Sequence, residues 1–485
     1  MGVKTKILSL LKNSNFLSLS SNMVVAVFGF FSFLILVRTL DPDYFGEWVL
    51  YITAGNFIEM LRFGITRTAI IRFLSGAKEN ERKKLIGANW IIGLGTTTVV
   101  AALLWIIYNI FPTVVSNSGF SLFFIWYPVL AFVNLPFNNA LSILQADQRF
   151  DRILLIRTLN VGSFVVFLLV NFFVLHWGLM LILYVHLAIN LLTSVFSLIL
   201  RWDGINNIIH AGKNAIKELL DFGKYTTGTL IGSNLLKSSD TFIIGLSPFL
   251  GTAGVAFYSV PLKLTEILEI PLRSTVATAF PRMSKASIQK NVEEVKNIYY
   301  AYTGAMTYLL IPLIIVAFIF AEEFVLILGG REYLETATIF RIFCIYGLFL
   351  PIDKFTGVAL DSINKPKKNF YKVLYMAFAN IFGDSVVIFL VSKFLLGFSL
   401  AALLIGSDTG ISYLSESATG YAFITTLELV AMVTIIFTII GIIVGQYYLR
   451  QETKIQFKQI FIHGWGFILY MIESTIPRLK FIKKD

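Results

Sequence analysis

The sequence predicts an all-α polytopic membrane protein. Hydrophobic residues make up 56% of the 485 residues and charged residues only 14%, and the mean hydropathy is +0.76. Apolar runs of about 20 residues, the length that crosses a bilayer as a helix, recur along nearly the whole chain. They are too long to be the alternating ten-residue strands of an outer-membrane barrel. An ordinary soluble protein is therefore excluded.

We expect about twelve transmembrane helices in two six-helix lobes, related by a pseudo-two-fold axis along the membrane normal. The expected spans are residues 16–37, 45–71, 86–110, 121–142, 154–174, 178–200, 225–246, 253–280, 298–320, 336–360, 371–391 and 421–449. The connection 391–420 is the longest on its side and contains the apolar run FLLGFSLAALLIG, which we interpret as a re-entrant or interfacial segment.

Four domains follow from this pattern. Residues 1–200 form the N-terminal lobe, 201–224 a polar cytoplasmic linker, 225–449 the C-terminal lobe and 450–485 a basic cytoplasmic or interfacial tail. With an even number of spans and the amino terminus inside, 30 of the 40 Lys and Arg residues lie on the cytoplasmic side. Only Arg38, Arg331 and Lys393 lie opposite. This bias predicts that both termini are cytoplasmic.

An internal repeat supports two equivalent lobes. Glu59-Met60-Leu61 corresponds to Glu266-Ile267-Leu268 at an offset of 207 residues. The same offset aligns Thr68 with Thr275 and Phe73 with Phe280. The segment Tyr44-Phe45-Gly46 corresponds to Thr252-Ala253-Gly254 at almost the same offset. The second and eighth spans are therefore expected to be symmetry partners.

The second span carries charges that an apolar helix does not need. An arginine at the bilayer centre costs about 2.5 kcal/mol or more, so each one requires a partner or a ligand. Glu59 and Arg62 are three residues apart and can neutralise one another. Arg67 has no acid nearby in its own helix, so we expect its guanidinium to bind an anion such as phosphate.

The eighth span has a polar stripe. Lys263, Glu266 and Arg273 fall within roughly a quarter of the helix circumference and must face the protein interior. Two interpretations stay open, a self-neutralised ladder that includes Glu269 and a ligand-binding face. Pro271 is expected to kink or break this helix.

Other spans hold further candidates. Lys237 and Asp240 share a face of the seventh span, and Arg341 lies near the outer end of the tenth. Asp384 stands alone in the eleventh span. Asp240, Glu266 and Asp384 are candidates for coupling transport to an ion, because desolvation raises the proton affinity of a buried carboxylate. Internal pairs and interhelical hydrogen bonds are the alternatives.

No catalytic constellation, nucleotide-binding motif or pair of histidine ligands is found, so we expect neither enzymatic activity nor a cofactor or metal. The single cysteine, Cys344, excludes an intramolecular disulfide. Charges dispersed over two repeated halves fit a secondary transporter better than a channel.

The residues Arg38-Thr39-Leu40-Asp41-Pro42-Asp43-Tyr44-Phe45-Gly46, between a polar-start first span and an arginine-bearing second span, carry a family likeness. The chain resembles the polysaccharide-unit flippases, of the lipid-linked oligosaccharide, O-antigen or capsule type, of the multidrug/oligosaccharidyl-lipid/polysaccharide exporter superfamily. The resemblance covers most of the chain, and the 391–420 connection departs from it.

This resemblance implies transport of an undecaprenyl-pyrophosphate-linked oligosaccharide from the cytoplasmic to the periplasmic leaflet of a bacterial inner membrane. The implied cavity lies between the lobes. Its expected pyrophosphate and glycan contacts are Arg62, Arg67, Lys237, Lys263, Arg273 and Arg341. Implied partners are membrane lipids and a polysaccharide polymerase with its chain-length regulator, and no nucleic acid. The alternatives are a cation-coupled multidrug exporter of the same fold and a non-transporting member of a polysaccharide assembly complex.

Overall fold

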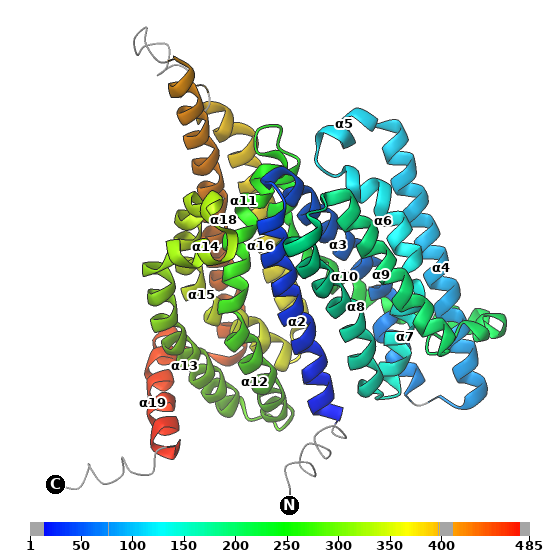
Figure 1. Cartoon of the computed structure of the whole chain (residues 1–485). Helices are drawn as coiled ribbons and strands as arrows, with labels where there is room; N and C mark the ends of the chain where they lie inside the picture. The colour runs from blue at the N-terminus through cyan, green and yellow to red at the C-terminus, as the bar shows by residue number, and fades with distance from the viewer. Residues whose placement is uncertain (1–13, 76, 396, 398–410, 476–485) are drawn as a thin grey trace, which may run out of the picture. The chain divides into compact units, whose positions relative to one another are not determined.

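The computed structural model describes residues 14–75, 77–395, 397 and 411–475, which fold as helices joined by short connections (Figure 1). Most of the apolar run that we singled out between residues 391 and 420 lies outside the described residues. By their contacts the residues form two compact units, Met1–Ala256 (unit 1) and Phe257–Asp485 (unit 2). The six-plus-six division at the linker stays a prediction, because the contact boundary falls inside a helix.

Unit 1 contains nine α-helices, a π-helical turn and a 3-10 turn among the described residues, together with the first part of α11. They are α2 (Ser14–Thr39), α3 (Pro42–Leu74), α4 (Glu79–Ile110), α5 (Pro112–Asn117), α6 (Ser121–Val133), α7 (Leu135–Ala146), α8 (Phe150–Val170), η1 (Asn171–Leu175), α9 (Leu179–Ile199), η2 (Ile205–His210) and α10 (Lys213–Gly245).

The chain continues through α11 into unit 2. The helices from there on are α11 (Gly251–Leu268), α12 (Ile270–Ile288), α13 (Val292–Ile319), α14 (Ala321–Gly329), η3 (Arg331–Thr336), α15 (Ala337–Ser362), α16 (Pro366–Val386), η4 (Val387–Val391), α18 (Ile411–Thr453) and α19 (Phe457–Thr475).

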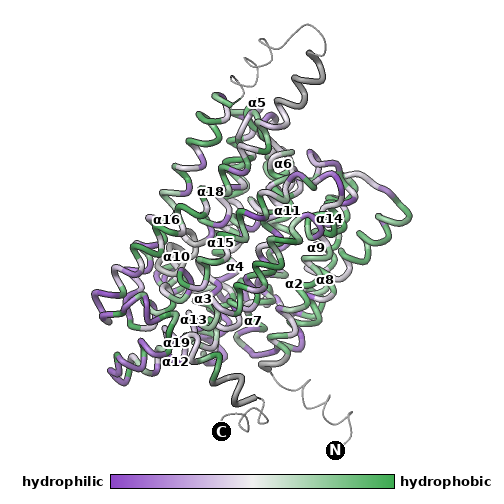
Figure 2. Tube along the Cα trace, turned by 90° about the vertical axis from the view of Figure 1, so that its left-hand side faces the viewer, coloured by the Kyte–Doolittle hydropathy of each residue, from purple (hydrophilic) through white to green (hydrophobic). Residues whose placement is uncertain are grey.

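Each of the twelve expected spans falls on a helix or a helix pair. Among the described residues, eight helices are long and apolar enough to cross a membrane, or nine if the bent pair α6–α7 is one span. Figure 2 shows long hydrophobic stretches along helices such as α16 and α18. The helices α3, α10 and α11–α12 lie at the second, seventh and eighth expected spans and do not meet this apolarity test. Those are the spans in which the sequence concentrates charge.

Local sequence explains where several helices start and break. Asn291 caps α13 by accepting a hydrogen bond from the Glu294 amide at 3.1 Å. Pro366 begins α16, where its missing N–H costs nothing. The expected break at Pro271 is confirmed, because α11 ends at Leu268 and α12 starts at Ile270.

The motif Arg38–Gly46, which carries the family resemblance and is called the family-like motif below, forms the junction between α2 and α3. Pro42 occupies the first turn of α3, and Phe45 is fully buried with its ring 5.2 Å from that of Phe33. Gly46 touches the backbone of Thr252, so that a side chain there would overlap it. The Thr252 hydroxyl also donates to the Asp43 carboxylate at 2.6 Å. The two segments that the repeat pairs by sequence therefore meet in space.

The connection between α9 and α10 is packed against the rest of unit 1. The Trp90 indole N–H donates to the Asp203 carbonyl at 2.8 Å, and Gly87 approaches the backbone of Asn207 too closely for a side chain. The Arg152 guanidinium lies 5.2 Å from the Trp202 ring centre. The predicted linker is thus attached to the start of α4 and not a loose tether.

In unit 2 the tail helix α19 packs along α13 (Figure 1). Gly304 and Gly464 meet at the crossing, where a methyl group on either would overlap the backbone of the other helix. Aromatic contacts flank the crossing, with Tyr302 to Phe467 and Tyr308 to Trp465 both at 5.5 Å between ring centres. The tail helix is therefore held by a close helix–helix contact.

We expect Gly464→Ala to separate α19 from α13, because its methyl group would collide with backbone that cannot move aside. Gly466→Ala is the matched control, since a methyl group there meets nothing within 4 Å. Limited proteolysis of the purified protein should cleave the tail faster in the first variant only. Equal protection of both variants would contradict the close contact.

Candidate functional site

The Glu59–Arg62 pair of α3 is a buried hub. The Arg62 Nη2 atom lies 3.2 Å from Glu59 Oε1, and the Arg62 side chain is fully buried. Glu59 also accepts hydrogen bonds from the Tyr127 hydroxyl and the Asn138 amide, each at 3.2 Å. The guanidinium stacks 4.7 Å from the Phe63 ring centre. Arg62 is therefore neutralised, and the pair ties α3 to α6 and α7.

Arg67 is placed differently. It follows Arg62 by five residues, which turns its side chain about 140° away around the helix. It is solvent-exposed, and among the described residues it makes no ion pair or hydrogen bond. The sequence expectation of a guanidinium without a local acid thus holds in the fold as well.

Lys237 and Asp240 lie on α10, which packs along α3 in unit 1. Lys237 is exposed and Asp240 is only 8% exposed. The Ser239 hydroxyl contacts the Asp240 carboxylate at 3.5 Å. The two predicted residues therefore lie in different environments on one helix.

The polar stripe of the eighth expected span divides at the break between α11 and α12. Lys263 pairs with Glu266 at 2.9 Å within α11, and Arg273 in α12 pairs with Glu269, also at 2.9 Å. The Lys263 and Arg273 side chains are 26% and 56% exposed. These are pairs between near neighbours on the helix surface, which solvent screens and which exchange partners readily.

The last two predicted residues also belong to unit 2. Arg341 of α15 pairs with Glu322 of α14 at 2.9 Å and donates to the Phe318 carbonyl at 3.4 Å. Asp384 of α16 is completely buried. Its burial matches the sequence expectation of an intramembrane carboxylate.

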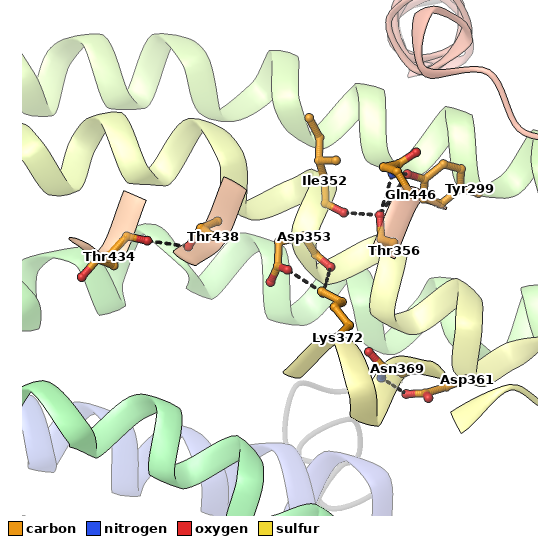
Figure 3. A network of polar contacts seen from close by, with 10 residues as sticks. All are labelled: Tyr299, Ile352, Asp353, Thr356, Asp361, Asn369, Lys372, Thr434, Thr438 and Gln446. Carbon is orange, nitrogen blue, oxygen red and sulfur yellow. Dashed lines mark hydrogen bonds and ion pairs between the residues drawn. The ribbon is translucent and has the colours of Figure 1, made fainter. Parts of the chain in front are cut away.

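A polar network in unit 2 was missed by the sequence reasoning (Figure 3). Lys372 of α16 forms a buried ion pair with Asp353 of α15 at 2.5 Å, and its Nζ also donates to the Asp353 carbonyl at 2.8 Å. The Gln446 amide of α18 donates to the Tyr299 hydroxyl at 2.5 Å and to the Thr356 hydroxyl at 2.8 Å. The network joins α13, α15, α16 and α18. Lys372 is one of the 30 basic residues that the charge count places on the cytoplasmic side, although it is the second residue of the expected span 371–391.

Arg157 of α8 was missed for the same reason. Its Nη1 donates to Asn22 Oδ1 at 3.0 Å and to Ser21 Oγ at 3.3 Å, which links α8 to α2. It is partly buried. Its position three residues inside the expected fifth span is the signal that would have identified it as an intramembrane arginine.

Two solved structures share the fold of this chain. A multidrug resistance transporter of the MATE family and MOP superfamily, in an inward-facing conformation, matches with a TM-score of 0.68 at 14% identity, over 90% of this chain and 99% of that one. The lipid II flippase MurJ in an inward closed conformation matches with a TM-score of 0.65 at 14% identity, over 95% and 92%. These likenesses confirm the fold class, an all-helical polytopic membrane fold that the chain shares with those two proteins.

The family follows from the sequence match. The family described as polysaccharide biosynthesis protein matches residues 35–338, more than half of the chain, and the chain belongs to it. A curated relative, the probable low-salt glycan biosynthesis flippase Agl15 of Haloferax volcanii, is 23% identical over 154 residues. That match spans about a third of each chain, 32% of this one and 32% of the relative. The resemblance stated from the motif is confirmed at the level of this family of polysaccharide biosynthesis proteins.

The two arginines of α3 should respond differently to truncation. Arg62→Ala leaves Glu59 buried without its counter-charge, which costs about 3–5 kcal/mol. Arg67→Ala removes an exposed side chain and should change the stability by no more than about 0.5 kcal/mol. Thermal unfolding of both purified variants, followed by tryptophan fluorescence, measures the difference.

Glu59→Gln combined with Arg62→Gln is the control for this comparison, because it removes both charges and should recover part of the loss. A Tm for Arg67→Ala as low as that of Arg62→Ala would give Arg67 a structural role instead.

Proposed function

We propose that the chain is an alternating-access flippase that moves undecaprenyl-pyrophosphate-linked oligosaccharide repeat units across a membrane. In this proposal the units pass from the cytoplasmic to the periplasmic leaflet of a bacterial inner membrane, with both termini cytoplasmic. They then enter the biosynthesis of O-antigen, capsule or exopolysaccharide.

Arg67 is the observation that carries the proposal. It is exposed, lies within a helix at an expected span and has no carboxylate partner among the described residues. A guanidinium in that situation needs an anion, and its planar fork of donors matches the oxygens of a phosphate group. A cation exporter has no use for an unneutralised arginine, since it would repel the substrate.

The relatives support the same substrate class. The Haloferax volcanii relative is described as a glycan biosynthesis flippase, and MurJ as a lipid II flippase. A lipid-linked glycan has a polar head that must avoid hydrocarbon and a prenyl tail that prefers it. A transporter of this fold keeps the head out of hydrocarbon when its halves alternate around a polar path. The prenyl tail can remain in lipid during the same movement.

The other predicted cations have supporting roles in this proposal. Lys263 and Arg273 form exposed pairs on α11 and α12 that exchange partners readily, so each can turn to a passing phosphate. Lys237 is exposed on α10. Arg62 acts through the α3 hub, and Arg341 contributes at the outer end of its helix.

Coupling to an ion gradient is a further part of the proposal. Asp240 and Asp384 are buried carboxylates, and Glu266 is an exposed one. A buried carboxylate that gains and loses a proton or sodium ion changes the charge inside its unit, which biases a two-state transporter. We propose Asp384 as the first residue to test, because it is completely buried.

The decisive experiment is reconstitution of the purified protein into liposomes with a fluorescent polyprenyl-pyrophosphate oligosaccharide. Loss of fluorescence to a membrane-impermeant quencher reports how fast the head group changes leaflet. We expect protein-dependent movement, and Arg67→Ala should slow it about 10- to 100-fold, the value of one or two charge-assisted hydrogen bonds. Arg149→Ala, which removes an exposed arginine paired with Asp151, should leave the rate unchanged.

Two results would contradict the proposal. An unchanged rate in Arg67→Ala would remove the phosphate role from that residue. Absence of head-group movement, together with efflux of a cationic dye under a proton gradient, would show a multidrug exporter instead.

The coupling proposal has its own test. Asp384→Asn should abolish any stimulation of flipping by an imposed proton or sodium gradient, because an amide neither binds a proton nor carries a charge. Binding of the substrate at equilibrium should persist in this variant. Gradient-dependent flipping that survives the substitution would exclude Asp384 as the coupling group.

A further inference from the structure

Polar groups from three helices of unit 1 lie at the same depth. Arg67 lies seven residues before the end of α3 and Arg157 seven residues after the start of α8, so each is about 10 Å from its helix end. Asn22 lies at a similar depth from the start of α2. Because α3 begins where α2 ends, the start of α2 and the end of α3 are at one end of the unit. The Arg82–Asp147 ion pair, at 2.7 Å, brings the starts of α4 and α8 to that end as well.

Arg157 is held in place by neutral groups. One nitrogen, Nη1, donates to both Asn22 and Ser21, and Ser21 is only 1% exposed. These acceptors orient the guanidinium without cancelling its charge. The Nε and Nη2 atoms of Arg157 make no hydrogen bond to any residue that the structure describes, so a fork of donors remains available.

The two arginines share one electrostatic environment. The positive charge of Arg67 acts on that of Arg157, and no carboxylate of the described chain compensates either of them. Three other arginines of the same unit are each paired with an acid, Arg62 with Glu59, Arg82 with Asp147 and Arg149 with Asp151. Two uncompensated positive charges at one depth of the unit repel one another, and an anion that contacts both relieves this repulsion.

We propose that Arg157 and Arg67 together bind the pyrophosphate of the lipid-linked substrate, with Asn22 as a positioning residue for Arg157. This inference rests on the proposed function. A pyrophosphate diester carries one negative charge on each phosphate, which matches one guanidinium for each. A phospholipid headgroup such as phosphatidylglycerol has a single phosphate and leaves one arginine uncompensated.

Equilibrium binding tests the pairing directly. The purified protein in nanodiscs is titrated with a polyprenyl-pyrophosphate oligosaccharide and, separately, with phosphatidylglycerol, and bound lipid is counted by native mass spectrometry. We expect Arg157→Gln to weaken binding of the pyrophosphate lipid about tenfold or more and to leave phosphatidylglycerol unaffected. Arg149→Gln is the matched control, because it removes the same charge from the N-terminal end of α8 outside the cluster.

Three further variants separate binding from structure. Arg157→Lys keeps the charge but loses the planar fork, so its affinity should lie between those of the parent protein and Arg157→Gln. Asn22→Ala should weaken binding less than Arg157→Gln, and should have no added effect in the Arg157→Gln background. The loss of affinity in the combined Arg67→Gln and Arg157→Gln variant should be smaller than the product of the two single losses. The effects are not independent, because both residues contact the same anion.

Failure of this inference can be distinguished from failure of the proposed function. If Arg67→Gln weakens pyrophosphate binding while Arg157→Gln does not, the pairing is wrong and the proposed function stands. If Arg157→Gln lowers only phosphatidylglycerol binding, or lowers only the Tm, the residue serves a membrane lipid or the fold instead. If the parent protein binds no pyrophosphate lipid, the proposed function and this inference both fail.

Discussion

A charge inside a membrane protein must be compensated, and this constraint organises the chain. Several charged side chains described within its helices are paired, as Arg62 is with Glu59, Lys372 with Asp353 and Arg341 with Glu322. These pairs join different helices or stabilise one, and they remove the cost of placing ions in a medium of low polarity. A charge that the fold leaves uncompensated, such as that of Arg67, is one that gains by meeting an anion.

Close backbone contacts provide the second constraint. Gly46 lies against Thr252 in unit 1, and Gly304 against Gly464 in unit 2. Within a bilayer, helices associate through such close packing, because lipid gives them no hydrophobic reason to do so. The contact at Gly46 also gives the family-like motif a physical meaning. Its proline starts α3, its phenylalanine is buried, and its glycine admits the neighbouring chain.

The repeat illustrates how similar sequence reaches different environments. Glu59 and Glu266 correspond in the predicted duplication and each has a basic neighbour three residues away. In α3 the acid contacts Arg62, Tyr127 and Asn138, whereas in α11 it is half-exposed and pairs with Lys263. The first pair therefore supports the fold, whereas solvent screens the second. Packing from other helices, which no local pattern specifies, makes this distinction.

Local sequence was enough to predict the helical membrane fold, a helix or helix pair at each expected span, the break at Pro271 and the absence of a local acid beside Arg67. These follow from local composition, because hydrocarbon accepts only long apolar helices and proline cannot continue one. The tertiary structure alone decided which charges are neutralised across helices. It placed Arg157 beside Asn22, and it buried Lys372 against Asp353. Such pairings depend on which helix faces which, and residues far apart in the chain meet only when the bundle has formed.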